Sequence, residues 1–258
     1  MLLAIDVGNT NIVIGCMEGR EIRFTERLST DEGKTSLEYA ILFRVTLDMH
    51  QIDPSMIDGA IISSVVPVIT PVIRTALRKI TGIQALILGP GTRTGLNIRL
   101  DDPSAVGADL VAGAVGALSA YAPPLVIIDM GTATTLTAVD RDRNFLGGAI
   151  MPGLRLSLNS LVSEASMLQG ISLDTPKNAI GRNTADAIRS GIVYGHAAMI
   201  DGLLDRMEEE LGGGVTAVAT GGLAAGVIPA CRHKIELDDT LLLTGLQAIY
   251  EKNRRQKQ

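Results

Sequence analysis

Cysteine and histidine are scarce in this sequence, and the few that occur are not grouped. The 258-residue chain has two cysteines, Cys16 and Cys231, and three histidines. Two isolated cysteines cannot build a disulfide framework, and neither residue type has the spacing of a zinc site. We therefore expect a reducing, cytoplasmic environment, and neither zinc chemistry nor a histidine-activated nucleophile.

Positive charge and long apolar runs are also limited. Lysine and arginine total 23 against 28 acidic residues, a formal net charge of −5, so we expect no general affinity for nucleic acid. The uncharged run at 110–128 contains glycine and is broken by Pro123 and Pro124, which favours a helix followed by a strand over a membrane span. The sequence begins with a core-strand pattern and shows no signal peptide. We expect no membrane association.

What the chain does have is the composition of a globular protein. Hydrophobic residues make up 46% and charged residues 20% of the sequence. The length suits one large domain or two small ones. We expect two lobes, at residues 1–117 and 118–258, because the sequence repeats itself at about half its length.

The first copy of the repeat is the stretch at 1–16. Apolar runs at 2–5 and 12–14 have strand length, and the Gly-Asn pair between them is typical of a hairpin turn. Asp6 therefore ends a core strand beside a turn. A carboxylate there needs compensation, and the turn offers backbone N–H groups and short polar side chains. The pattern predicts a site for magnesium and phosphate.

The second copy is the stretch at 125–139. Asp129 takes the place of Asp6, Gly131 that of Gly8, and Thr132 follows in the turn. One such Asp-x-Gly is equally well explained as ordinary turn punctuation. Two copies, each opening one half of the chain, favour a duplicated domain with a function at both turns.

The rest of the sequence predicts a mixed α/β arrangement. We expect strands at 21–28, 59–66, 84–88, 145–153 and 215–219, and helices at 36–50, 68–79, 154–168, 185–211 and 241–253. Leu37, Ile41, Leu42 and Val45 are expected on the buried face of the first helix. The glycine-rich stretch at 89–95 lacks the P-loop lysine and is interpreted as a plain turn.

Asp109 lies near the start of the uncharged helix. A carboxylate there is favoured by the helix macrodipole alone, so a structural role and a catalytic role are equally compatible with the pattern.

Several motifs together, in this order, resemble the type III pantothenate kinase family. They are Asp6-Val-Gly-Asn-Thr10, Gly107-Ala-Asp109, Asp129-Met-Gly-Thr-Ala133, Gly147-Gly-Ala-Ile-Met-Pro-Gly153, Gly181-Arg-Asn-Thr184 and Thr220-Gly-Gly-Leu-Ala224. The resemblance implies duplicated ribonuclease H-like (actin-like) α/β domains, with mixed central sheets flanked by helices. It further implies ATP-dependent phosphorylation of the primary alcohol of pantothenate, the first step of coenzyme A synthesis, by a homodimer that uses Mg²⁺ and a monovalent cation, K⁺ or NH₄⁺.

The resemblance also implies roles for individual residues. Asp109 would be the general base, Asp6 would serve the magnesium ion, and Asp129 would serve the monovalent cation. The phosphate and nucleotide contacts would be Gly8, Asn9, Thr10, Gly131, Thr132, Gly221 and Gly222. The pantothenate pocket would include Leu100, Gly107, Ala108, Leu110 and Thr184.

Two positions depart from the family pattern. Leu110 stands where the family has an arginine, and Leu100 where it commonly has a tyrosine. Losing a charge-assisted donor can weaken binding by about one to two powers of ten. Three readings remain open: a pantothenate kinase, a silent homologue that binds a metabolite and acts in regulation, and a kinase or phosphatase for another substrate of the same superfamily.

Overall fold

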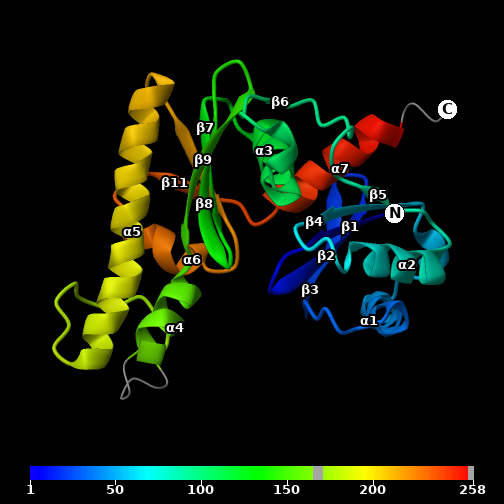
Figure 1. Cartoon of the computed structure of the whole chain (residues 1–258), viewed down its shortest axis with the longest axis horizontal. Helices are drawn as coiled ribbons and strands as arrows, with labels where there is room; N and C mark the ends of the chain where they lie inside the picture. Colours follow the sequence, from blue (N-terminus) through cyan, green and yellow to red (C-terminus); the bar gives the residue numbers. More distant parts are fainter. Residues whose placement is uncertain (165–170, 255–258) are drawn as a thin grey trace. The chain divides into compact units, whose positions relative to one another are not determined.

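The chain forms two compact units in the computed structural model, which describes residues 1–164 and 171–254 (Figure 1). Unit 1 comprises residues 1–96, 101–119 and the C-terminal segment from Leu241. Unit 2 comprises residues 97–100 and 120–240. Among the described residues, no helix is both long enough and apolar enough to cross a membrane.

Each unit is built on one mixed sheet. In unit 1 the strand order is β3-β2-β1-β4-β5, with bounds β1 Leu2–Val7, β2 Asn11–Glu18, β3 Glu21–Ser29, β4 Gly59–Ser64 and β5 Leu86–Ile87. In unit 2 the order is β11-β10-β7-β8-β9-β6, with β7 Leu125–Met130, β8 Ala133–Val139, β9 Asn144–Pro152, β10 Thr216–Thr220, β11 Ile235–Leu237 and β6 Asn97–Ile98.

The two sheets have the same topology apart from β6. In unit 1, β1, β2 and β3 are antiparallel neighbours, and β4 and β5 run parallel to β1. In unit 2, β7, β8 and β9 are antiparallel neighbours, and β10 and β11 run parallel to β7. Asp6 is the next-to-last residue of β1, and Asp129 is the next-to-last residue of β7. The duplicated domain predicted from the repeat, and the ribonuclease H-like α/β fold implied by the resemblance, are therefore confirmed.

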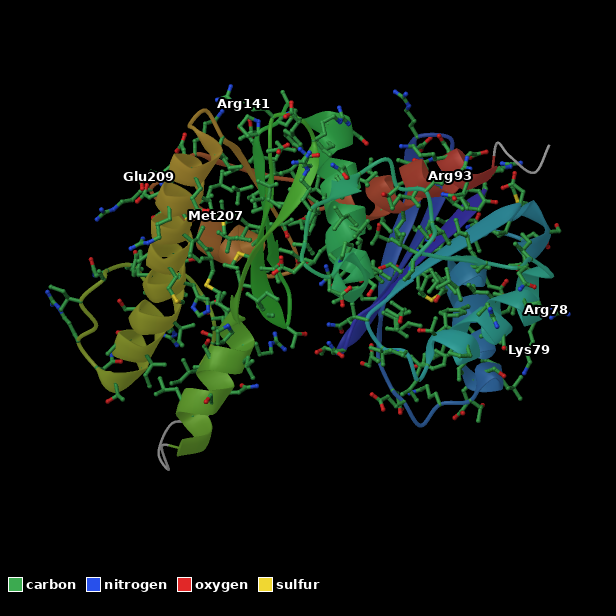
Figure 2. All side chains as sticks on the ribbon, turned by 45° about the horizontal axis from the view of Figure 1, so that its top comes forward. Arg78, Lys79, Arg93, Arg141, Met207 and Glu209 are labelled. Atoms are coloured by element: carbon green, nitrogen blue, oxygen red, sulfur yellow. The ribbon has the colours of Figure 1, made fainter. Side chains whose placement is uncertain are left out.

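Among the described residues of unit 1 there are four α-helices: α1 Ser36–Met49, α2 Thr70–Thr81, α3 Ala108–Ala120 and α7 Leu241–Arg254. A capping box starts α1, in which the Thr35 side chain accepts from the Glu38 N–H and Glu38 accepts from the Thr35 N–H. Helix α2 ends at Gly82, whose φ of +73° favours glycine. Arg78 and Lys79 carry positive charge in its last turn, which complements the helix dipole (Figure 2).

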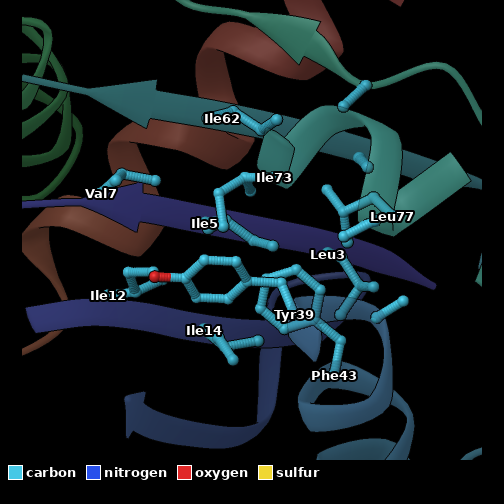
Figure 3. Packing of buried hydrophobic residues seen from close by; sticks show 14 of the residues in the cluster. Leu3, Ile5, Val7, Ile12, Ile14, Tyr39, Phe43, Ile62, Ile73 and Leu77 are labelled. Atoms are coloured by element: carbon cyan, nitrogen blue, oxygen red, sulfur yellow. The ribbon is translucent and has the colours of Figure 1, made fainter. Parts of the chain in front are cut away.

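The core of unit 1 lies between the β1–β2–β4 surface and helices α1 and α2. Figure 3 shows Tyr39 and Phe43 of α1 beside the strand residues Ile12 and Ile14. The buried face of α1 consists of Tyr39, Ala40, Phe43, Thr46 and Leu47. The predicted face was wrong: Leu37, Ile41 and Val45 are 58%, 53% and 50% exposed, and Leu42 is only partly buried. Tyr39 and Phe43 are 0% and 2% exposed, so the two aromatic side chains, and not the aliphatic stripe, face the core.

Helix α7 packs in unit 1 although it comes last in sequence. It lies against β1 and β4, and a Cβ added to Gly15 would meet the Leu243 side chain at 2.6 Å. Leu243, Leu246 and Ile249 are buried with Leu2 and Ile61 in a shared cluster. The division expected at residues 117/118 placed this helix in the second lobe, whereas the apolar second face of the unit 1 sheet holds it.

The helices of unit 2 are α4 Leu154–Glu164, α5 Thr184–Leu211 and the short α6 Ala224–Val227. The end of the helix predicted at 154–168 lies outside the described residues. On α5 the buried face includes Ile192, Val193, Ala197, Ile200 and Leu204. The helical spacing of the apolar residues at 185–211 also predicts Met199 on this face, but Met199 is 42% exposed.

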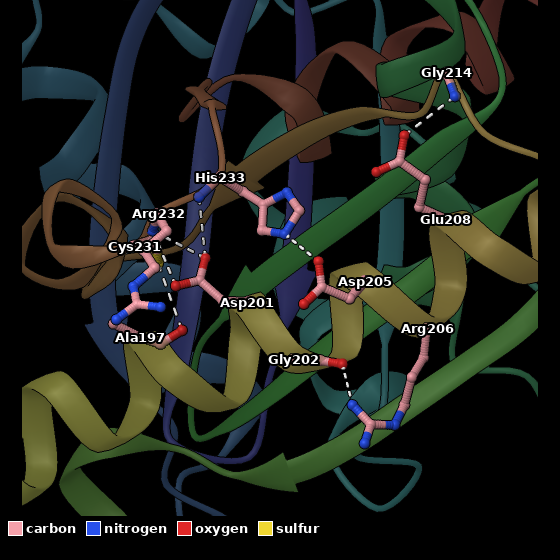
Figure 4. A network of polar contacts seen from close by, with 10 residues as sticks. All are labelled: Ala197, Asp201, Gly202, Asp205, Arg206, Glu208, Gly214, Cys231, Arg232 and His233. Atoms are coloured by element: carbon pink, nitrogen blue, oxygen red, sulfur yellow. Dashed lines mark hydrogen bonds and ion pairs between the residues drawn. The ribbon is translucent and has the colours of Figure 1, made fainter.

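A polar network fixes α5 to the segment that leads into β11 (Figure 4). The Asp201 carboxylate accepts from the backbone N–H groups of Arg232 and His233 at 2.9–3.1 Å. The His233 Nε2 lies 2.8 Å from the Asp205 carboxylate one turn along the helix. These contacts, together with the buried apolar face, hold α5 on unit 2.

Candidate active site

The β1–β2 turn beyond Asp6 is a well-anchored loop. The Gly8 N–H donates to the Asn11 carbonyl at 3.0 Å, and the Thr30 hydroxyl donates to the Gly8 carbonyl at 2.6 Å. The Thr30 N–H donates to the Thr10 carbonyl at 3.0 Å. Asn9 and Thr10 are left exposed. The loop can therefore present polar groups to a phosphate with little rearrangement. The role of Thr30 could not be predicted from the sequence, because the residues that it contacts are about twenty positions away.

Asp6 is half-buried between its two neighbouring strands. Its register partners are Val13 on β2 and Ser63 on β4. The Ser63 hydroxyl is fully buried and has no hydrogen-bond partner among the described residues. The only signal for Ser63 in the sequence was the change from apolar residues to Ser63-Ser64 at the strand end.

The second turn, between β7 and β8, is also closed by the N–H of its glycine, but it is one residue shorter. The Gly131 N–H donates to the Ala133 carbonyl at 3.0 Å, and Thr132 is exposed. The Gly153 N–H donates to the Thr132 carbonyl at 3.2 Å, and a Cβ at Gly153 would lie 2.4 Å from that oxygen. Helix α4 starts at the next residue, so its positive end lies at this turn. Gly153 belongs to one of the motifs found in the sequence, but no role was predicted for it.

The Asp129 end of β7 also meets the exit of β10. Thr220 is the register partner of Asp129. A Cβ at Gly221, which has φ +97°, would lie 2.7 Å from the Met130 backbone and 2.8 Å from the Asp129 carboxylate. Only glycine fits there. Gly222 follows and is exposed. Unit 2 thus brings together Asp129, the Gly131–Thr132 turn and Gly221.

Asp109 lies in the first turn of α3, with its carboxylate folded back over the helix start. Its Oδ1 accepts from the Leu110 N–H at 2.8 Å. A Cβ at Gly107 would lie 2.4 Å from the same oxygen, which explains the Gly-x-Asp spacing. Burial raises the pKa of the Asp109 carboxyl, while the backbone N–H groups of Leu110 and Asp109 oppose the rise. A carboxylate with a raised pKa in the first turn of a helix is suited to accept a proton.

The remaining predicted substrate residues divide between the units. Ala108 and Leu110, next to Asp109 in unit 1, are partly buried. Leu100 lies in unit 2, where its Cδ2 would be 3.1 Å from a Cβ at Gly147. Thr184 is the first residue of α5 and is exposed.

Comparison with known proteins identifies the family. A model of the type III pantothenate kinase family matches residues 2–206. A protein of Moorella thermoacetica named type III pantothenate kinase is 40% identical over 253 residues, which are 98% of this chain and 100% of the relative.

The chain belongs to the type III pantothenate kinase family.

Solved structures with low sequence identity share the fold of this family member. The activator of 2-hydroxyisocaproyl-CoA dehydratase from Clostridium difficile, solved with bound ADPNP, has a TM-score of 0.56 at 14% identity and covers 99% of this chain and 97% of its own. The ROK hexokinase from Thermus thermophilus has a TM-score of 0.50 at 13% identity, and the match covers 98% of this chain and 99% of the hexokinase chain. Two sheets flanked by helices are thus common to these proteins.

The carboxylates of this type III pantothenate kinase family member are dispersed. No group of three or more histidine, cysteine, aspartate or glutamate residues within 1–164 and 171–254 could hold a metal ion. Mg²⁺ in kinases is commonly bound by one or two carboxylates together with substrate phosphates and water. A single carboxylate beside an anchored turn, as at Asp6, fits a metal that arrives with ATP.

Proposed function

We propose that this protein transfers the γ-phosphoryl group of ATP to the primary alcohol of pantothenate, the first step of coenzyme A synthesis. The observation that carries the proposal is the 40% identity, along essentially the whole chain, to relatives named type III pantothenate kinase. The two anchored turns and Asp109 supply the parts that phosphoryl transfer requires from a protein, namely positioning and charge stabilisation.

In this proposal the Asp109 carboxylate accepts the proton of the attacking hydroxyl. General bases of this kind contribute typically ~10²–10⁴-fold to the rate. The Gly107 position leaves the carboxylate room over the helix start. Each of the two turns, Asn9–Thr10 in unit 1 and Gly131–Thr132 in unit 2, offers backbone N–H groups and hydroxyls to the phosphates of ATP, and in unit 2 the N-terminus of α4 adds to this. Gly221 and Gly222 directly follow β10 and would contact the nucleotide.

Two cations complete the proposed site. Asp6 would hold Mg²⁺ through its carboxylate, and the ion neutralises charge on the phosphates when bound. Asp129, with the Thr220 and Thr135 hydroxyl side chains as its register partners, would serve a monovalent cation, K⁺ or NH₄⁺. Oxygen donors of this type suit hard cations. Replacing Asp6 by Asn should shift the magnesium dependence of turnover, while Asp109→Asn should leave it unchanged.

Two of the residues proposed to contact the acceptor depart from the family pattern: Leu100 in unit 2 and Leu110 in unit 1. Thr184, Gly107 and Ala108 would contact pantothenate, but the guanidinium that the family places at position 110 is absent. This observation favours a second candidate, phosphorylation of a related alcohol that lacks the group which the arginine binds.

A coupled assay for ADP release separates the two candidates. Pantothenate and a panel of primary alcohols are compared with and without K⁺, in the natural protein and in Leu110→Arg. If pantothenate is the substrate, the arginine should lower its KM by about one to two powers of ten. If another alcohol is preferred, the substitution should not help that alcohol. Intact ATP binding without phosphorylation in either protein would leave the silent, regulatory homologue as the remaining reading.

We also propose that the protein acts as a homodimer in the cytoplasm. The apolar side chains of β9 and α4 support the first point, because Leu146, Ile150 and Leu156 are 40%, 74% and 51% exposed. The two free cysteines support the cytoplasmic location, because thiols stay reduced there. A sedimentation measurement that finds only monomer at micromolar concentration would rule out the dimer.

A further inference from the structure

Unit 2 contains a pocket at the start of α5 that no step of the proposed reaction uses. It has a volume of about 330 Å³ and is formed by residues 175–182 and the first turns of the helix. Its lining includes the charged residues Lys177, Arg182, Asp186 and Arg189. Thr184, proposed to contact pantothenate, begins the same helix but does not line the pocket.

The wall of the pocket is firmly attached to the helix. The Ser190 hydroxyl donates to the Ala179 carbonyl, and the Tyr194 hydroxyl donates to the Pro176 carbonyl at 3.0 Å. A Cβ at Gly181 would lie 2.2 Å from the Ala187 nitrogen, so backbone meets backbone there. Thr175 is tied to the Gly226 carbonyl at 2.9 Å. The pocket is therefore a built feature of the fold and not a gap under a loose loop.

The charge of the lining is predominantly positive. Three cationic side chains face one carboxylate, and that carboxylate is already engaged: Asp186 accepts from Arg189 at 3.0 Å and from the Asn183 amide at 2.8 Å. Within the described parts of the chain, Lys177 and Arg182 form no salt bridge. The Arg189 Nε–H is buried and has no hydrogen-bond partner among the described residues. The protein has a net charge of −5, so this local excess of positive charge favours the binding of an anion.

The helix adds to the same field. Helix α5 has 28 residues, and its N-terminus presents the positive end of the macrodipole at the pocket. Helix N-termini with nearby arginines are common phosphate sites, because N–H groups and planar guanidinium forks both match phosphate oxygens.

We propose that this pocket binds the phosphate or diphosphate group of a small molecule. Lys177, Arg182 and the Arg189 guanidinium line the pocket and supply its positive charge. The volume is at the lower end of small-molecule sites, ~300–1,000 Å³, so a compact phosphorylated metabolite fits the pocket better than a full dinucleotide. The site goes beyond the proposed function, since none of its lining residues is assigned to ATP, metal or pantothenate.

Calorimetric titration of the full chain with pyrophosphate tests the proposal. The titration is run at low ionic strength with the nucleotide site filled by a non-hydrolysable ATP analogue and Mg²⁺. We expect saturable binding that weakens about tenfold for each charge removed in Lys177→Gln and Arg182→Gln. The matched control is Lys234→Gln with Arg206→Gln, which removes the same charge from exposed positions of unit 2 outside the pocket.

A nitrogen-15 NMR measurement on the arginine side chains provides an independent readout. The Nε–H resonance of Arg189, assigned with Arg189→Lys, should shift on addition of pyrophosphate and should not shift in the Lys177/Arg182 double variant. Equal weakening in the pocket and control variants, no binding at millimolar pyrophosphate, or tighter binding of succinate would each overturn the proposal. A failure of the ATP analogue to bind would count against the kinase function alone, because the dependence on Lys177 and Arg182 would still be measurable.

Discussion

At the scale of single residues, Asp109 has two opposed effects. Its carboxylate is withdrawn from water, and burial raises its pKa. The charged form is therefore unfavourable in the folded protein, although a general base must be charged in order to accept a proton. At a pH at which Asp109 is charged and can accept a proton, its carboxylate should therefore lower the free energy of unfolding.

Replacing Asp109 by Asn should therefore separate stability from turnover. We expect turnover to fall by ~10²-fold or more, because the amide cannot take the proton. The free energy of unfolding should rise at pH 7. Because the folded-state pKa is raised above its ordinary value, protonation of Asp109 stabilises the folded state below the unfolded-state pKa, and this contribution is lost as the pH rises through the folded-state pKa.

The advantage of the Asn variant should thus grow from about pH 4 to pH 7. Urea unfolding at both pH values measures it. An equal difference at the two pH values would show that burial does not disfavour the Asp109 charge.

Gly107 is the second residue with a separable role. In Gly107→Ala the new methyl group would meet the Asp109 carboxylate at 2.4 Å, and a side-chain end can move aside. We expect kcat to fall, with the melting temperature nearly unchanged. Gly113→Ala, inside the helix that starts directly after Gly107, is the control, since nothing lies within 4 Å of its added Cβ. That variant should keep its kcat and gain about 0.5–1 kcal/mol from helix propensity. A Gly107→Ala protein with full kcat would refute a positioning role.

At the scale of elements, the contact between α3 and α7 depends on glycine. A Cβ at Gly116 would lie 1.9 Å from the Leu241 carbonyl, and a Cβ at Gly245 would lie 1.8 Å from the Ala112 carbonyl. Both clashes are with backbone, so neither can be relieved by a side-chain rotation. Gly245→Ala should destabilise unit 1 by about 1–3 kcal/mol or more. Chemical denaturation measures the loss, with Gly113→Ala again as control. A stable Gly245→Ala protein would mean that the two helices are not in backbone contact.

The strands and helices also show how much of the fold could be predicted from the sequence. The strands that open each half were found because apolar runs bounded by turn residues are local signals, and the resemblance supplied the roles of the turns. Strands β6 and β11 were missed, since two or three residues carry no period. The buried face of α1 was assigned to the wrong side, because its aliphatic stripe has perfect i, i+4 spacing while Tyr39 and Phe43 form the actual contact. The distant contacts of Ser63, Thr30 and Gly153 have no local signature.

At the scale of the whole molecule, each unit contains one free cysteine. Cys16 lies in unit 1 and Cys231 in unit 2. Burial raises the pKa of the Cys16 thiol to about 11 and that of the Cys231 thiol to about 12. The thiolate is the reactive form. Neither residue should therefore react appreciably with iodoacetamide at pH 8 in the folded protein.

Single-cysteine variants extend this expectation to unfolding. In increasing urea, alkylation of Cys16 should follow the opening of unit 1, and alkylation of Cys231 that of unit 2. Mass spectrometry of quenched samples gives both curves. In Gly245→Ala the Cys16 curve should move to lower urea, while the Cys231 curve moves less. Rapid labelling of either thiol without urea would contradict the burial.

The position of α7 also has a consequence for the order in which the protein is made. Residues 1–96 leave the ribosome before α7 does, so their sheet lacks the cover of Leu243, Leu246 and Ile249 until α7 has been translated. Unit 2 is complete at residue 240. Multidomain chains usually fold in N-to-C order during synthesis. Here the half that is translated first is the last that can finish its core, so the nascent chain must keep one apolar face of its first sheet uncovered while the other half folds.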